Sequence, residues 1–142
     1  MTDLSRLLAQ VRPASAVRGA GVALACLSPG LVGRARAVAA SYAAGWPLGK
    51  PGLQVFAVVP DEDEEPWKRA VVPFATSGAS WTLVMLVGVS AVRRTGLPAP
   101  VAAALLGGAV ALGDSMLADV GERMKAKAQA AAAERDAASE TT

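Results

Sequence analysis

The sequence has 142 residues, of which 53% are hydrophobic and only 4% are aromatic, with a single cysteine and no histidine. The absence of imidazole removes the usual general base and the commonest metal ligand, and one cysteine cannot form an internal disulfide. The formal net charge is +2, but the signs are segregated: residues 4–60 contain no acidic residue, whereas residues 61–65 are all acidic. This Ala-, Val-, Leu- and Gly-rich composition predicts one mainly α domain, with helices suited to packing in lipid.

The first part of the chain, residues 1–45, is expected to be a basic helical region. Apolar side chains at helical spacing in residues 2–12, followed by Pro13, predict a short amphipathic helix. Residues 19–33 are apolar but interrupted by Pro29, so they are too short and broken to span a bilayer by themselves. We interpret this region as an interfacial or partly re-entrant helix whose cationic side chains face anionic lipid.

Residues 46–70 read as an irregular, Pro/Gly-rich and acidic cytoplasmic linker. Within it, residues 53–59 are compatible with a single extended strand that would pack on another part of the chain, on the membrane surface or on a partner. The acidic run 61–65 lacks the ligand spacing of a calcium loop, which favours a solvated face or pairing with the basic N-terminal third. Trp46 and Trp67 suit the lipid headgroup level, and ordinary packing is the alternative.

Residues 71–119 are predicted to form a transmembrane helical hairpin. Residues 71–92 carry no charge and would extend about 33 Å as a helix, which is enough to cross a bilayer core. Residues 96–117 form a second span whose only charged residue is Asp114. The alternative is a pair of buried helices in a soluble α-protein, but residues 81–89 are apolar almost all round and lack a polar stripe.

The distribution of basic residues predicts the orientation of the hairpin. The turn contains two arginines, Arg93 and Arg94, which are also expected at the membrane interface. The flanks contain more: Lys68, Arg69, Arg123, Lys125 and Lys127. We therefore expect a multi-pass protein of the cell (plasma) membrane with cytoplasmic termini, in which residues 120–142 form an Ala-rich, charged helical tail.

Two features within the spans are candidate sites. Asp114 is expected to lie opposite Thr76 and Ser77, either in a structural hydrogen bond or in a proton or ion pathway. Small residues recur along the second span and predict a face that another helix approaches closely, either the first span, through Gly78 and Gly88, or a helix of another subunit. The residues of this face are Ala103, Gly107, Ala111 and Ser115, with Gly108 beside them.

The sequence shows no nucleophile with a base, no phosphate-binding glycine loop and no metal-ligand cluster, which predicts neither enzymatic activity nor a cofactor. Our first hypothesis is a small non-catalytic integral membrane protein that acts as an accessory or assembly component of a larger complex. The alternatives are a self-assembling, holin-like or transporting membrane protein, and a basic membrane-surface adaptor. The expected partners are lipid and other membrane subunits or a second copy, because dispersed basic residues without aromatic neighbours disfavour nucleic acid.

Overall fold

The computed structural model describes residues 3–52 and 58–140, and these residues are mainly helical, as predicted. The described ranges contain no strand. Residues 53–57 of the expected strand lie outside them, and residues 58–59 belong to no regular element. The elements in chain order are α1 (Asp3–Ala9), α2 (Pro13–Leu27), α3 (Leu31–Gly45), the 3-10 turn η1 (Trp46–Leu48), α4 (Pro66–Arg94) and α5 (Ala99–Glu140).

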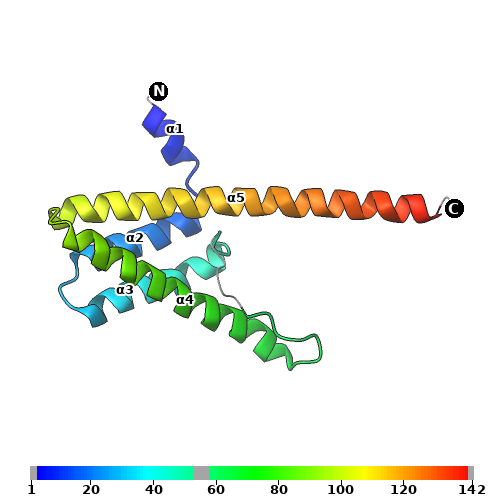
Figure 1. The fold of residues 1–142 in the computed structure, drawn as a ribbon, viewed down its shortest axis with the longest axis horizontal. Helices are drawn as coiled ribbons and strands as arrows, with labels where there is room; N and C mark the ends of the chain where they lie inside the picture. Colours follow the sequence, from blue (N-terminus) through cyan, green and yellow to red (C-terminus); the bar gives the residue numbers. More distant parts are fainter. Residues whose placement is uncertain (1–2, 53–57, 141–142) are drawn as a thin grey trace.

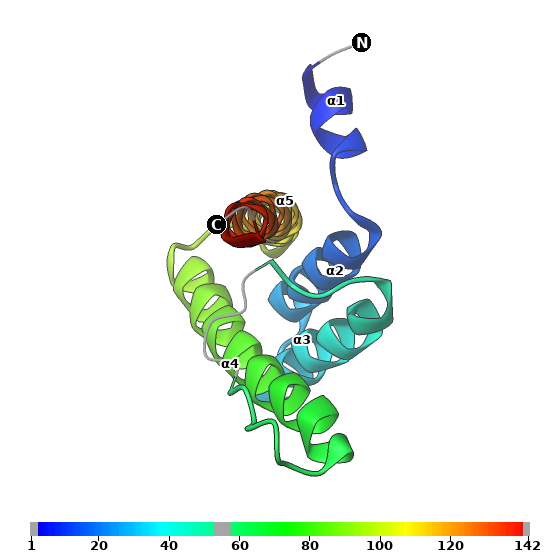
Figure 2. The same ribbon diagram turned by 90° about the vertical axis from the view of Figure 1, so that its right-hand side faces the viewer.

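The N-terminal hairpin α2–α3 occupies the space between the two long helices. Figures 1 and 2 show α4 and α5 diverging from their short connection, with α2 running along α5 and α3 lying against α4. The two long helices contact each other far less than each contacts this hairpin. The basic N-terminal region is therefore part of the body, where α2 packs on α5 and α3 packs on α4.

Proline and glycine set the helix boundaries. Pro13 begins α2 and Pro66 begins α4, positions at which the missing N–H of proline has no helical partner to lose. Gly96 follows the end of α4 with a φ of 77°, a left-handed conformation that glycine adopts without strain. Pro29 and Gly30 separate α2 from α3, so the break expected in residues 19–33 is the turn of the N-terminal hairpin.

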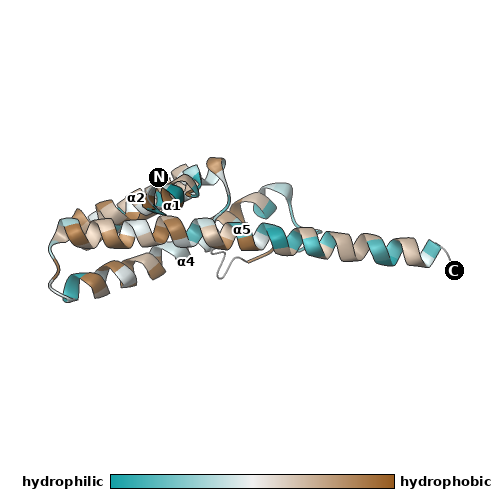
Figure 3. Cartoon of the chain, turned by 90° about the horizontal axis from the view of Figure 1, so that it is seen from above, coloured by the Kyte–Doolittle hydropathy of each residue, from teal (hydrophilic) through white to brown (hydrophobic). Residues whose placement is uncertain are grey.

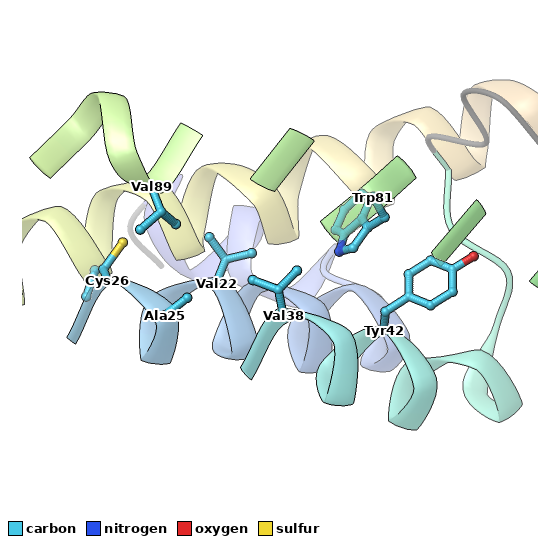
Figure 4. Packing of buried hydrophobic residues seen from close by; sticks show 8 residues of the cluster. Val22, Ala25, Cys26, Val38, Tyr42, Trp81 and Val89 are labelled. Carbon is cyan, nitrogen blue, oxygen red and sulfur yellow. The ribbon is translucent and has the colours of Figure 1, made fainter. Parts of the chain in front are cut away.

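The hydrophobic core lies where α2, α3 and α4 meet, and Figure 4 shows its side chains pointing toward one another. Tyr42 of α3 lies at one end of this core and contacts three aromatic rings, with centroids 5.7 Å from Trp46, 5.8 Å from Phe74 and 6.2 Å from Trp81. The cluster consists of Val22, Ala25, Cys26, Val38, Tyr42, Trp81, Val89 and Ala103. Because this core is small, much of the apolar surface of the long helices is left uncovered.

Two segments extend from this body. The helix α1 has no buried residue, so the short amphipathic helix expected at the N-terminus is present and exposes Leu4, Leu7 and Leu8. At the other end of the chain, α5 continues as an exposed single helix (Figure 1), and Figure 3 shows that its hydrophilic residues are concentrated in this projecting half.

Candidate functional site: a buried arginine–aspartate network

The centre of the site is an ion pair between α2 and α5. Arg18 Nη1 lies 3.0 Å from Asp114 Oδ2, and the two side chains are 0% and 1% exposed. Ser15 Oγ donates a hydrogen bond to the same carboxylate oxygen over 2.7 Å. The backbone N–H of Gly52 donates to the other oxygen, Oδ1, over 2.8 Å. The Asp114 carboxylate therefore accepts from three donors, two on α2 and one in the segment that follows η1.

The same network fixes the segment that follows η1. Arg18 Nη2 donates to the carbonyl oxygen of Gly49, so the guanidinium and the carboxylate together hold both ends of residues 49–52. Gly52 lies so close to the backbone of α5 that an added Cβ would collide with the carbonyl oxygen of Asp114. A buried charge is tolerated only when it is paired and hydrogen-bonded. Arg18 is paired through Nη1 and Nη2, which join α2 to α5 and to the linker, while its buried Nε has no hydrogen-bond partner within the described residues.

A second, more exposed layer of charge lies beside the buried pair. Arg12 Nη2 lies 2.6 Å from Asp119 Oδ1 and 2.8 Å from Glu122 Oε2, and the Arg12 backbone N–H donates to Ser115 Oγ over 3.0 Å. The hydrogen bond from Arg12 lowers the pKa of Glu122, and the two carboxylates raise the pKa of Arg12. Since these side chains are 35–68% exposed, water screens both pairs, and each contributes little to the stability of the fold.

The small residues of α5 face α2. A Cβ added to Gly107 would lie 2.8 Å from the Ala23 Cβ, and one added to Gly19 would lie 2.8 Å from the Ala111 Cβ. Gly108 has open space beside it. The prediction named the first span or another subunit as the approaching helix. The structure corrects this: the neighbour of Gly107 and Ala111 is α2, whose own Gly19 completes the close contact.

The remaining members of the predicted small-residue face, Ala103 and Ser115, are also buried against other parts of the protein. Ala103 is buried in the core cluster, and Ser115 is buried beside the α1–α2 connection. On α4, a Cβ added to Gly78 would lie 3.1 Å from the Tyr42 ring, whereas one added to Gly88 would have nothing within 4 Å. Neither glycine of α4 meets α5.

The expected contact of Asp114 with Thr76 and Ser77 is wrong. Ser77 Oγ accepts from Tyr42 Oη over 2.7 Å, and Thr76 Oγ1 donates to the Val72 carbonyl over 2.7 Å. Asp114 instead bonds to residues of α2 and of the linker. The physical reason is that the N-terminal hairpin separates α4 from α5 along this part of their length.

The expectation that the basic N-terminal third faces anionic lipid is wrong for two of its arginines, because Arg12 and Arg18 pair with acidic residues of α5. The acidic run is also not their partner. Within the described residues, Glu64 and Glu65 each approach Lys68 to 3.9 Å, an exposed contact at the start of α4.

The predicted interfacial residues lie at opposite ends of the body. Trp46 is half-buried, with its ring centroid 5.0 Å from that of Phe74, so it packs within the protein. Trp67 is 60% exposed, and its Nε1 donates to Glu65 over 2.6 Å. Arg93 donates to the carbonyl of Ser28 over 3.0 Å at the end of α2, and Arg94 is exposed.

Sequence reasoning found Asp114 but missed Arg18. The available signal was that Arg18 is the only charged residue of α2 and that a carboxylate within an apolar span requires a partner. The position of Arg18 relative to α5 depends on the tertiary arrangement of the hairpins, which local patterning does not reveal.

Arg18 and Asp114 neutralise each other in a buried ion pair, which fixes the position of α2 along α5. Within the part of the chain that the structure describes, no group of His, Cys, Asp and Glu could hold a metal ion. Comparison of the chain with protein-family models, with curated proteins and with solved structures found no match.

Proposed function

We propose that this chain is a small, non-catalytic integral membrane protein that serves as an accessory or assembly component of a larger membrane complex. Two of its helices, α4 and α5, are long and apolar enough to cross a membrane. The observation that carries the proposal is how little of them the protein itself covers: in the most apolar stretch of α4, 11% of the residues are buried. A core helix of a soluble protein would be mostly buried.

The uncovered surface consists of large apolar side chains. Leu83 and Val87 of α4 are 65% and 70% exposed, and Leu105 of α5 is 61% exposed. Contiguous apolar surface of this kind favours contact with lipid or with another protein. Membrane insertion would remove it from water without any rearrangement of the body.

The buried network supports an anchoring role over a conducting one. A proton or ion pathway needs polar groups that exchange partners with water or a substrate. Here Asp114 is saturated by Arg18, Ser15 and the Gly52 N–H. The buried pair of Arg18 and Asp114 therefore favours a role in holding α2 on α5.

The projecting half of α5 supports an accessory role. Residues 121–140 form an exposed, Ala-rich helix carrying both signs of charge, which extends about 30 Å at 1.5 Å per residue. Most helical stability in proteins comes from tertiary packing, so a partner surface would stabilise this exposed stretch further. The tail therefore offers the contact through which this protein would join a larger assembly.

The orientation predicted from basic residues is retained in this proposal. The bond from Arg93 to Ser28 places the α2–α3 turn beside the α4–α5 connection, which adds Arg34 and Arg36 to the basic residues at that end. The opposite end has more, even when Arg18 is left out: Arg12, Lys50, Lys68, Arg69, Arg123, Lys125 and Lys127. The positive-inside rule then still assigns the termini to the cytoplasm.

The test has two stages. Membranes of cells that express the full chain are washed at alkaline pH, and retention of the protein in the pellet is the expected result. The protein is then extracted in mild detergent, and its native mass and co-purifying chains are measured. Stoichiometric association with a larger membrane protein supports the accessory role. A homo-oligomer alone overturns it in favour of self-assembly, and release by the alkaline wash overturns membrane insertion.

The orientation is tested separately with single cysteines. In a Cys26→Ser background, Thr95→Cys marks the α4–α5 connection and Ser139→Cys marks the tail. With an impermeant maleimide, we expect intact cells to label only the first variant and inverted vesicles to label only the second. The opposite pattern contradicts the proposed topology.

A further inference from the structure

Two apolar grooves lie side by side on the surface between α3 and α4. The first, of about 420 Å³, is formed mainly by α4 and includes Leu83 and Arg94. The second, of about 460 Å³, is formed mainly by α3 and includes Arg36. Leu31 and Leu86 line both grooves and so form their shared wall. Both volumes fall within the range of small-molecule sites, about 300–1,000 Å³, and each groove is apolar apart from its arginine and a single hydroxyl.

Four arginines are gathered at this end of the molecule, and they divide into two kinds. Arg34 Nε and Arg93 Nη1 both donate to the Ser28 carbonyl, over 3.1 and 3.0 Å, and so hold the turn at the end of α2. Arg36 and Arg94 are exposed, and within the described residues their side chains make no hydrogen bond or ion pair with the protein. The two arginines that line the grooves are therefore the two whose guanidinium groups remain available.

No carboxylate offsets this charge. Residues 4–60 and 66–113 contain no Asp or Glu, so α2, α3, α4 and the first part of α5 contribute none. An anion at this end would meet guanidinium groups alone. Guanidinium binds phosphate through paired, charge-assisted hydrogen bonds, and apolar grooves beside it suit hydrocarbon chains.

We propose that these grooves form a binding site for one anionic phospholipid, with its phosphate held by Arg36 and Arg94 and its acyl chains lying along the grooves on either side of Leu31 and Leu86. The two available guanidinium groups and the apolar surface of the grooves match the two halves of such a molecule. The inference rests on the proposed membrane location, because only there would a diacyl lipid be the available ligand.

The test uses the full chain purified in neutral detergent. Dioleoyl phosphatidylglycerol and dioleoyl phosphatidylcholine are added separately, and bound lipid is measured by native mass spectrometry. These lipids share acyl chains and differ in net charge. We expect one tightly bound phosphatidylglycerol and weaker phosphatidylcholine binding. The double variant Arg36→Gln/Arg94→Gln should bind phosphatidylglycerol about thirtyfold more weakly, given roughly 1 kcal/mol per basic residue.

The matched control is Lys127→Gln/Arg135→Gln, which removes the same charge from the exposed tail and should leave binding unchanged. Thermal unfolding by circular dichroism should be the same for both variants, since none of the four side chains holds the body together. Equal binding of the two lipids, equal weakening in the control, or displacement of the lipid by excess inorganic phosphate alone overturns the lipid site. Because the alkaline wash tests membrane location independently, a membrane-retained protein without lipid selectivity refutes the site and leaves the proposed function standing.

Discussion

Replacing Asp114 by asparagine is the most informative perturbation of the buried network, because it changes charge with almost no change in shape. The amide oxygen of the introduced asparagine can still accept from the Gly52 N–H, and its NH₂ group can donate to Ser15 Oγ. What is lost is the negative charge 3.0 Å from Arg18 Nη1. The guanidinium, 0% exposed, is then left buried without a counter-charge.

The expected loss of stability depends on whether the altered hydrogen bonds or the uncompensated charge of Arg18 contributes more. An interhelical hydrogen bond in a membrane protein contributes only about 0.6 kcal/mol on average, so the altered hydrogen bonds alone would cost about 1 kcal/mol. Removing one partner of a buried ion pair costs about 3–5 kcal/mol, because the remaining charge is uncompensated. We therefore expect Asp114→Asn to destabilise the docking of α2 on α5 by about 3–5 kcal/mol.

The single thiol provides the assay. Cys26 lies in α2 and is 1% exposed, so it reacts only when the packing around this part of α2 opens. In mild detergent, where reclosing outpaces labelling, its maleimide reaction rate reports the population of the open state. A loss of 3–5 kcal/mol corresponds to a rate about 150- to 5,000-fold faster at 1.36 kcal/mol per factor of ten. The control Asp119→Asn removes an exposed charge and should change the rate less than about fivefold.

A double variant separates uncompensated charge from lost packing. Arg18→Met/Asp114→Asn removes both charges, while the introduced asparagine keeps its bonds to Gly52 and Ser15. We expect it to label more slowly than Asp114→Asn alone, because no charge remains buried. The free-energy cost of the double variant is compared with the sum of the costs of Arg18→Met and Asp114→Asn measured alone. If the two are equal, or if Asp114→Asn labels as slowly as Asp119→Asn, the reasoning about the ion pair is refuted.

Three further predictions use the same labelling assay. Gly107→Ala should accelerate labelling at least tenfold, because its Cβ would lie 2.8 Å from atoms of α2, whereas Gly108→Ala meets open space and should be neutral or slightly stabilising; equal effects would contradict the close α2–α5 contact. Tyr42→Phe removes a buried hydrogen bond to α4 and should cost about 1 kcal/mol, a roughly fivefold faster rate. Glu122→Gln should weaken docking at neutral pH. Because the bond to Arg12 lowers the Glu122 pKa, its difference from the wild-type protein at the same pH should begin to shrink below the ordinary glutamate pKa of 4.5 and vanish only below the lowered pKa; a pH-independent difference would contradict this pairing.

The helices were predictable because their signals are local. The charge-free stretch 71–92 and the proline after the first helix, Pro13, act within a few residues of their own position. The start of α4 at Pro66 was not predicted, because it lies in the stretch interpreted as a linker. The small-residue face of α5 was also readable, because a four-residue repeat marks one side of any helix. These signals say what each helix can do, and none of them names its neighbour.

The neighbours could not be predicted because they depend on the N-terminal hairpin. A sequence reading that places residues 19–33 at the lipid surface leaves the two spans to pack on each other, which assigns Asp114 to Thr76 and Ser77. Once α2 lies between them, Asp114 meets Arg18 and the hydroxyl of Ser77 meets Tyr42. A single misplaced hairpin therefore accounts for both wrong contacts.

The segregation of charge along the chain now has a structural explanation. The N-terminal third lacks carboxylates because its counter-charges lie on α5, where Asp114, Asp119 and Glu122 face Arg18 and Arg12. Breaking the exposed pairs of Arg12 would cost little stability, whereas breaking the buried pair of Arg18 would cost much more. Since α5 follows α2, α3 and α4 in the sequence, Arg18 has no partner until α5 has been made. Stable docking of α2 therefore requires α5, and a chain that ends before Asp114 should leave Cys26 reactive.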